Sequence, residues 1–71
     1  MTDYTPALNE DQLFDAARLM CEQGGGFASC IANAYFRADM RNRRRLLYAF
    51  GDLFVEFDAY VEDMKKEKAN D

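Results

Sequence analysis

Residues 46–64 read LLYAFGDLFVEFDAYVEDM, and this stretch decides the fold. Its large apolar side chains recur at alternating steps of four and three, which is the a/d seam of a helix that packs against another helix. The seam consists of Leu46, Phe50, Leu53, Phe57, Tyr60 and Met64, with Leu47, Phe54 and Val61 beside it. Such aromatic surface needs a cover from the chain itself, a second copy or another protein, so the seam is predicted to form the core or a dimer interface.

The composition predicts an all-α fold. Strands favour β-branched residues, and the chain has few of them; they are Thr2, Thr5, Ile31, Val55 and Val61. The 71 residues make one domain at most, and a core of this size supplies only about 3–5 kcal/mol. We therefore expect a small bundle of three to four helices that forms an intertwined or side-by-side homodimer.

Three segments organise the chain. Residues 1–8 are predicted to be a flexible N-terminal arm, residues 9–68 a single helical domain, and residues 69–71 a frayed tail. Asn9 and Gln12 predict a capping box that opens a helix ending near residue 23. The predicted buried face of this helix consists of Leu13, Phe14, Ala16, Ala17, Met20 and Cys21, and Leu19 is predicted to be exposed.

Three consecutive glycines, residues 24–26, predict a turn between helices, with Gly24 in the left-handed conformation. The next helix is predicted over residues 27–38, with Phe36 on the side opposite its core face. That face is predicted to consist of Phe27, Cys30, Ile31, Ala34, Tyr35 and Ala38. Asp39 is predicted to cap a third helix over residues 40–66. This helix is continuous or slightly kinked at Gly51; alternatively, Asp52 caps a fourth helix.

Charge is segregated along the chain. Thirteen acidic residues oppose nine basic ones, which gives a net charge of −4 and excludes a global attraction to nucleic acid or to an anionic membrane. Five arginines nevertheless fall within nine residues: Arg37, Arg41, Arg43, Arg44 and Arg45. They predict either a patch that binds phosphate or ion pairs with acidic faces of this chain or a second copy, and the net charge favours the ion pairs. The Arg43 stem is predicted to pack near the seam.

No residue pattern points to catalysis. The chain has no histidine and one serine, Ser29, so neither a nucleophile–base pair nor a metal site can be assembled in the usual way. We predict no catalytic residue, no cofactor and no metal. Cys21 and Cys30 are predicted to be reduced and to pack as small hydrophobic residues; a disulfide across the glycine turn is the alternative. Without a long apolar run or a signal-like N-terminus, a cytoplasmic location with no membrane partner is expected.

About half of the chain resembles small uncharacterised proteins of bacteriophages, prophages and other mobile elements. The matching residues are Gly25, Gly26, Phe27, Ala34, Tyr35, Phe36, Arg37, Ala38, Asp39, Asn42, Arg45, Leu46, Ala49, Phe50, Leu53 and Phe54. Where that pattern has Pro-Asp, this chain has Gly51-Asp52. The resemblance implies a phage setting and the host cytoplasm, and the setting suggests a protein that blocks a host enzyme or defence complex.

Two functional hypotheses follow. The first is a small non-enzymatic protein–protein interaction module, such as a phage-encoded inhibitor or modulator of a host protein. Its candidate partner-binding residues are Leu19, Phe36, Arg37, Arg41, Arg44, Arg45 and Tyr48. The alternative is a small nucleic-acid-binding regulator that uses the arginines of residues 37–45.

Overall fold

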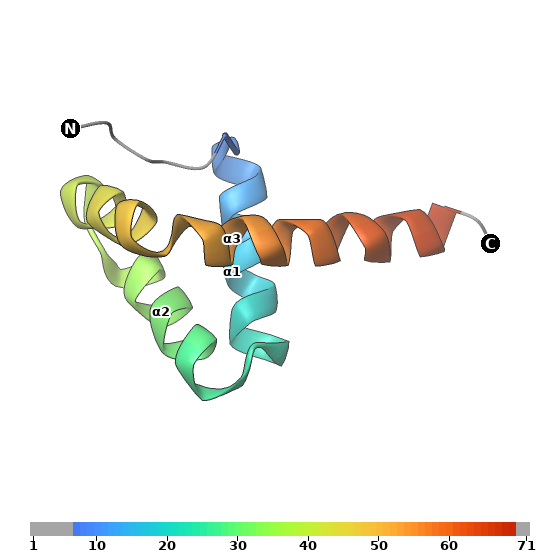
Figure 1. The fold of residues 1–71 in the computed structure, drawn as a ribbon, viewed down its shortest axis with the longest axis horizontal. Coiled ribbons are helices and arrows are strands. Elements are labelled where there is room, and N and C mark those ends of the chain that lie inside the picture. The colour runs from blue at the N-terminus through green and yellow to red at the C-terminus, as the bar shows by residue number, and fades with distance from the viewer. Residues whose placement is uncertain (1–6, 70–71) are drawn as a thin grey trace.

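The computed structural model describes residues 7–69 of the chain, with side chains for residues 7–66. Three helices follow one another, α1 (Glu10–Gln23), α2 (Gly25–Arg37) and α3 (Met40–Ala69) (Figure 1). No strand occurs in this part of the chain, and the predicted all-α class is confirmed. Residues 1–6 of the predicted arm and residues 70–71 of the predicted tail lie outside the described residues. Leu8, the last residue of the predicted arm, is half-buried against the core.

Helix α1 is the central element, because it packs against both other helices, whereas α2 and α3 touch each other less. Figure 1 shows α3 crossing α1, with the second half of α3 continuing beyond the other two helices. The molecule measures 44 × 26 × 16 Å along its principal axes. No helix in the described range is both long and apolar enough to cross a membrane.

The predicted starts of α1 and α3 are confirmed by their capping hydrogen bonds. The Gln12 N–H donates to Asn9 Oδ1 over 2.8 Å, and the Asn9 N–H donates to Gln12 Oε1 over 2.9 Å, which completes the capping box of α1. At the start of α3, the Asn42 N–H donates to Asp39 Oδ1 over 2.9 Å. Each bond satisfies a backbone N–H group that the first turn of a helix leaves without an internal partner.

The glycine turn is confirmed, but its left-handed residue is Gly25 and not Gly24. Gly24 has φ −86° and its N–H still donates to Met20 O over 3.0 Å, so it closes α1 in the right-handed conformation. Gly25, at φ 76°, makes the reversal and begins α2 two residues earlier than predicted. A Cβ on Gly24 would lie 2.7 Å from the Ala28 Cβ. The turn therefore requires Gly24 because α2 passes so close to it.

The close approach of α1 and α2 decides which face of α2 is buried. The contact uses small side chains, and Ala16, Ala17 and Ala32 have no exposed surface. The predicted face of α2 is confirmed at Tyr35, which is buried, and wrong in part. Phe27, Cys30 and Ala34 are exposed, and Ala28 and Ala32 are buried in their place. Bulky side chains at the predicted positions would hold the two helices apart.

Two predictions for α1 and one for α2 are also corrected. Leu19 was expected to be exposed, but it is buried because α3 covers a second side of α1. Phe14 was expected in the core, but it is 48% exposed and packs edge-on against Phe36, with ring centroids 5.1 Å apart. Phe36 itself is half-buried against the core and does not stand apart from it.

Helix α3 is a single run of helix with an interruption at Phe50, where φ is −127° and ψ is 23°. The interruption lies next to Gly51, which is buried, and both a kinked helix and a separate fourth helix stay predictions. The Asp52 carboxylate accepts a 3.0 Å hydrogen bond from the Leu53 N–H, the adjacent residue. An N-cap side chain reaches two or three residues ahead, so Asp52 does not cap a separate helix in that way.

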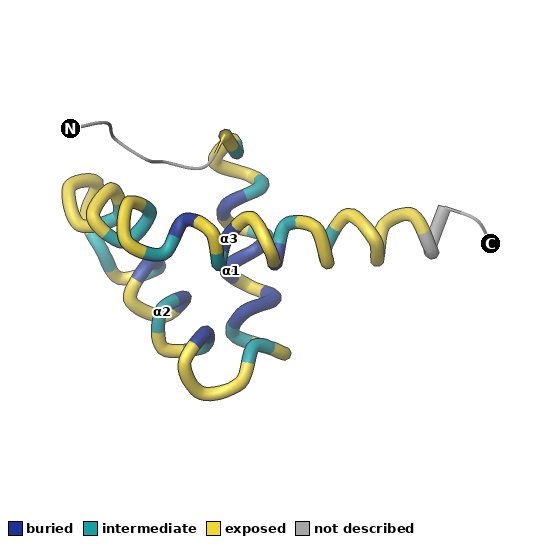
Figure 2. Tube along the Cα trace, in the orientation of Figure 1, coloured by how far each residue is buried: buried dark blue, intermediate teal, exposed yellow. Residues whose placement is uncertain are grey.

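The core forms where the three helices meet, and the buried positions gather there in Figure 2. Phe54 has no exposed surface, and its ring lies 5.2 Å from that of Tyr35. The predicted seam is only partly internal. Phe57 is buried and Leu46, Phe50 and Leu53 are half-buried, whereas Tyr60 is 47% and Met64 is 45% exposed. Tyr60 and Met64 are not core residues, because α3 extends past the helix that covers its middle.

Candidate functional site

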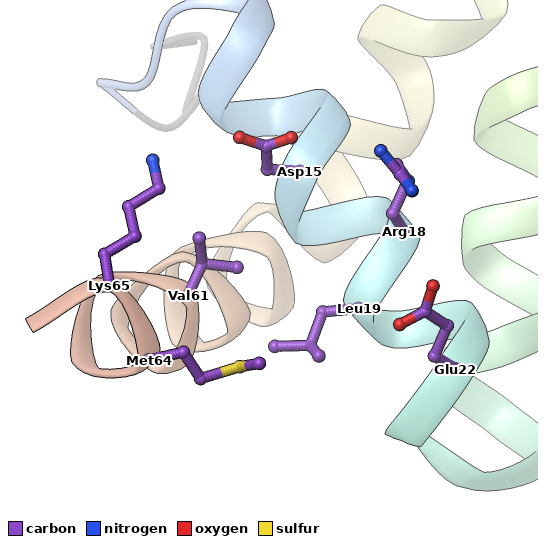
Figure 3. Close-up of a pocket in the computed structure, with 7 residues that line it drawn as sticks. All are labelled: Asp15, Arg18, Leu19, Glu22, Val61, Met64 and Lys65. Atoms are coloured by element: carbon purple, nitrogen blue, oxygen red, sulfur yellow. The ribbon is translucent and has the colours of Figure 1, made fainter. Parts of the chain in front are cut away.

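Two open hollows lie in the angle between the second half of α1 and the second half of α3. The first has a volume of about 340 Å³ (Figure 3). Its lining consists of Asp15, Arg18, Leu19, Glu22, Val61, Met64 and Lys65. Figure 3 shows the Met64 side chain pointing toward Leu19 across the hollow. Two carboxylates and two cations around its rim leave this hollow close to neutral.

The second hollow has a volume of about 550 Å³ and an acidic rim. Its lining consists of Leu19, Gln23, Glu56, Phe57, Tyr60, Asp63 and Met64. Glu56 and Asp63 are its only charged residues, and both are exposed. Since Leu19 and Met64 line both hollows, we treat the two as one surface and name it the α1–α3 groove.

Packing holds the apolar part of the α1–α3 groove in place. Phe57 is 8% exposed and anchors that turn of α3 in the core, while Tyr60 packs edge-on against it with ring centroids 5.3 Å apart. Leu19 is 6% exposed and supports the opposite wall from α1. Tyr60 and Met64 therefore present apolar surface to solvent from a supported backbone. The groove has the chemistry to accept apolar side chains, and its acidic side favours a ligand with basic flanks.

The arginines lie around the corner between α2 and α3. Arg37, Arg41, Arg44 and Arg45 are exposed, whereas Arg43 is half-buried and turns toward Tyr35. A third hollow of about 400 Å³ is lined by Ala34, Arg37, Ala38, Asn42, Arg45 and Leu46. The Arg45 guanidinium donates a long hydrogen bond of 3.4 Å to Asn42 Oδ1.

Within residues 7–66, no carboxylate forms an ion pair with these arginines. Within residues 7–66, the only ion pair joins Lys65 to Glu62 over 3.8 Å. The intramolecular form of the predicted arginine pairing is therefore absent from the described part of the chain. Asp39, the single acid within residues 37–45, directs its carboxylate to the backbone of Asn42. As far as the described residues show, the corner consequently offers a partner exposed guanidinium groups that pair with no carboxylate.

Two further features of the described side chains concern metal binding and the cysteines. No group of three or more cysteine, aspartate or glutamate side chains in residues 7–66 is arranged to hold a metal ion. Cys21 and Cys30 are both free thiols, so the alternative disulfide is absent. Cys30 is exposed and does not pack as the small hydrophobic residue that the sequence predicts. The Cys21 thiol lies 4.0 Å from Asn33 Oδ1.

The predicted partner-binding residues do not form one surface. Arg37, Arg41, Arg44 and Arg45 gather at the α2–α3 corner, and exposed Tyr48 lies one turn of α3 beyond Arg44. Leu19 lies instead at the α1–α3 groove, where its buried side chain forms part of the wall. Phe36 lies apart from both, half-buried against Phe14.

Sequence reasoning missed the α1–α3 groove as a site. Tyr60 and Met64 were assigned to the core or dimer seam, and no role was predicted for Glu56 or Asp63. The length of α3 could have indicated the groove, because the last turns of a helix that is longer than its neighbours are not covered by them. Phe27, which is 63% exposed, was also missed; it packs edge-on against Phe50 with ring centroids 5.6 Å apart.

Comparisons of this chain with models of protein families, with curated proteins and with solved structures find no match.

Proposed function

We propose that this chain is a small non-enzymatic protein–protein interaction module that docks a helical segment of a partner protein in the α1–α3 groove. The observation that carries the proposal is the exposure of Tyr60 and Met64 beside the wall formed by Leu19. Exposed apolar surface of this kind, supported by a packed backbone, is typical of sites where a partner binds.

The charges around the groove define the partner's chemistry. Glu56 and Asp63 flank the apolar surface on one side without a cation among the lining residues of that hollow. Rim charges of one sign steer partners of the opposite sign and repel like-charged ones. The partner segment is therefore apolar along one stripe and carries lysine or arginine beside that stripe. In the phage setting that the sequence motif suggests, the partner is a host protein and the chain acts as its inhibitor or modulator in the host cytoplasm.

Two matched substitutions test this proposal. Met64→Glu places a charge in the α1–α3 groove, whereas Val55→Glu places the same charge at another exposed apolar position of α3, 41% exposed and outside the groove lining. The wild-type chain and both variants serve as baits in a bacterial lysate, and the dissociation constant of each captured protein is then measured after purification. If the partner binds in the α1–α3 groove, its affinity for Met64→Glu is expected to be lower by roughly tenfold or more than for the wild-type chain. Its affinity for Val55→Glu is expected to be nearly unchanged.

Two results would contradict the proposal. One is a captured protein that binds Met64→Glu as tightly as the wild-type chain. The other is the absence of any captured protein that discriminates between the two variants.

A second candidate function is a nucleic-acid-binding regulator, and the free guanidinium groups at the α2–α3 corner favour it. Arg37, Arg41, Arg44 and Arg45 could contact a phosphate backbone in any sequence context. A salt titration with mixed DNA and RNA separates the candidates. The affinity of a regulator for nucleic acid falls steeply as the salt concentration rises, because binding releases counterions. An interaction module is expected to show no binding to nucleic acid at any salt concentration. The net charge of −4 favours the interaction module.

A further inference from the structure

The third hollow, at the α2–α3 corner, combines an apolar lining with two guanidinium groups. Ala34 and Ala38 contribute to this lining from the end of α2, and Leu46 contributes from the first half of α3. The only charged residues of the lining are Arg37 and Arg45, and both are exposed. The hollow therefore offers two positive charges beside apolar surface.

The third hollow is separate from the α1–α3 groove. Its lining residues all lie before Phe50, where α3 is interrupted, so the hollow depends only on α2 and the first half of α3. No residue lines both this hollow and either hollow of the groove. The basic corner and the acidic side of the groove are thus two surfaces that can bind different ligands.

The arginines at the beginning of α3 repel one another in the free chain. Arg41 precedes Arg44 by three residues and Arg45 by four, so it is a surface neighbour of both. All three lie in the first two turns of α3, near the positive end of the helix dipole, where cations are unfavourable. Among the described side chains none of them pairs with Asp39, whose carboxylate accepts the Asn42 N–H. An anionic ligand would relieve this repulsion.

We propose that the third hollow binds an acidic segment of a partner protein. A carboxylate of that segment lies between Arg37 and Arg45, and an adjoining apolar side chain covers Ala34 and Leu46. Guanidinium groups form paired hydrogen bonds with carboxylates, and the apolar lining is buried at the same time. The volume of about 400 Å³ is in the range of ligand-binding pockets. The inference goes beyond the proposed function, because it gives the chain a second docking surface of the opposite charge.

The apolar lining favours an acidic protein segment over a nucleic acid. A phosphate backbone would pair with Arg37 and Arg45, but it would place no apolar side chain on Ala34 and Leu46. A nucleic acid also carries a charge at every nucleotide, so its charge extends beyond the corner toward a chain whose net charge is −4. The charge of a protein segment can be confined to the corner.

Peptide binding tests the inference. The probe is a short synthetic peptide of glutamate and leucine, and calorimetry at low salt measures its affinity for the full chain. One control peptide has glutamine in place of glutamate and so lacks the charge. Another has serine in place of leucine and so lacks the apolar side chains. Both controls are expected to bind roughly tenfold more weakly than the probe, or weaker still.

Two matched alanine substitutions locate the site. Ala34→Glu places a carboxylate in the third hollow, where it repels the probe and competes for Arg37 and Arg45. Ala59→Glu adds the same charge at another exposed alanine, which lines none of the hollows described above. The affinity for the probe is expected to fall by roughly tenfold or more for Ala34→Glu and by less than about twofold for Ala59→Glu.

A second pair of variants separates the hollow from the net charge. Arg37→Gln/Arg45→Gln and Arg18→Gln/Lys66→Gln remove equal charge from the chain, and all four residues are exposed. The first variant is expected to weaken binding of the probe by roughly tenfold or more, and the second much less. Circular dichroism checks that every variant keeps its helices.

The inference would be overturned if the probe failed to bind the wild-type chain, or if it bound Ala34→Glu no more weakly than Ala59→Glu. Tighter binding of a single-stranded oligonucleotide of the same net charge would make nucleic acid the occupant. Self-association of the wild-type chain that Ala34→Glu abolishes would make a second copy the occupant. Met64→Glu lies outside the third hollow and is expected to leave the affinity for the probe unchanged, so failure of this inference is distinguishable from failure of the proposed function.

Discussion

Arg43 clamps α3 onto the end of α2 through Tyr35. Its Nε donates a 3.1 Å hydrogen bond to the Tyr35 backbone oxygen, and its guanidinium carbon lies 4.8 Å from the centre of the Tyr35 ring. Tyr35 is in the last turn of α2, and its carbonyl oxygen accepts two hydrogen bonds, one of 3.3 Å from the Ala38 N–H and the one from Arg43. The clamp separates Arg43 from the other arginines of the corner, which remain exposed.

Arg43→Lys is expected to lower the free energy of unfolding by about 1–2 kcal/mol. Lysine keeps the positive charge, but it lacks the Nε donor and the planar group that lies over the Tyr35 ring. Arg44→Lys is the matched control, since Arg44 is exposed, and it should change stability by less than about 0.5 kcal/mol. Urea unfolding followed by circular dichroism measures both. Equal effects of the two substitutions would contradict the clamp.

Alkaline pH is expected to destabilise the fold through Tyr35. Burial raises the pKa of Tyr35 above its ordinary value of 10.0; Arg43 opposes this rise and Glu10 adds to it. Between pH 10.0 and the raised folded-state pKa, Tyr35 therefore retains its proton more in the folded state than in the unfolded state. The contribution of Tyr35 to stability is thus complete below that pH and falls as the pH rises through the folded-state pKa.

Tyr35→Phe isolates this contribution, because it removes the ionisable hydroxyl and keeps the ring. Urea unfolding of both proteins at successive pH values is the measurement. The stability difference between the wild-type chain and Tyr35→Phe should be constant below the ordinary tyrosine pKa and should shift in favour of the variant above it. Parallel curves across that range would show that Tyr35 has the same pKa in both states.

Phe54→Ala is expected to unfold most of the protein. Phe54 is fully buried against Tyr35, and removal of a buried phenylalanine costs about 3–5 kcal/mol. A domain of this size has about 3–5 kcal/mol in total. The neighbouring Val55→Ala, at an exposed position, should leave the helical circular dichroism signal unchanged. Phe54→Leu retains most of the volume and should cost less than Phe54→Ala, which gives a measurable value if the alanine variant does not fold.

Local signals in the sequence predicted the starts of α1 and α3 and the turn between α1 and α2. The caps formed by Asn9 and Asp39 involve partners only three residues away, so the sequence holds all the information that they need. The interruption next to Gly51 was also predictable, because glycine is a weak helix former. These features depend on short stretches of chain and on no distant contact.

Contacts between distant residues were not predictable in the same way. A single apolar stripe identifies one buried face, but α1 is covered by two helices, so Leu19 lies in the core although it is outside the stripe. The buried face of α2 depends on how closely α1 approaches it, and the sequence of α2 alone does not reveal that distance. The small side chains of Ala28 and Ala32 are therefore buried, whereas Phe27 is exposed. The α1–α3 groove forms where α3 crosses α1, so predicting it also requires knowledge of contacts between residues far apart in the sequence. The exposed arginines were predictable, since charged side chains without buried partners stay at the surface.

The three glycines of the turn are expected to respond differently to alanine. At Gly24 the added Cβ would lie 2.5 Å from Met20 O and 2.7 Å from the Ala28 Cβ, so Gly24→Ala must move α2 away from α1 and should be the most destabilising change. At Gly25 the space is open, but φ 76° costs an alanine roughly 1–2 kcal/mol. At Gly26 the space is open and the backbone is helical, so Gly26→Ala should stabilise the chain by about 0.5 kcal/mol. The urea concentration at the unfolding midpoint should therefore rise in the order Gly24→Ala, Gly25→Ala, wild type and Gly26→Ala. A midpoint for Gly24→Ala above that for Gly25→Ala would contradict the close contact between Gly24 and Ala28.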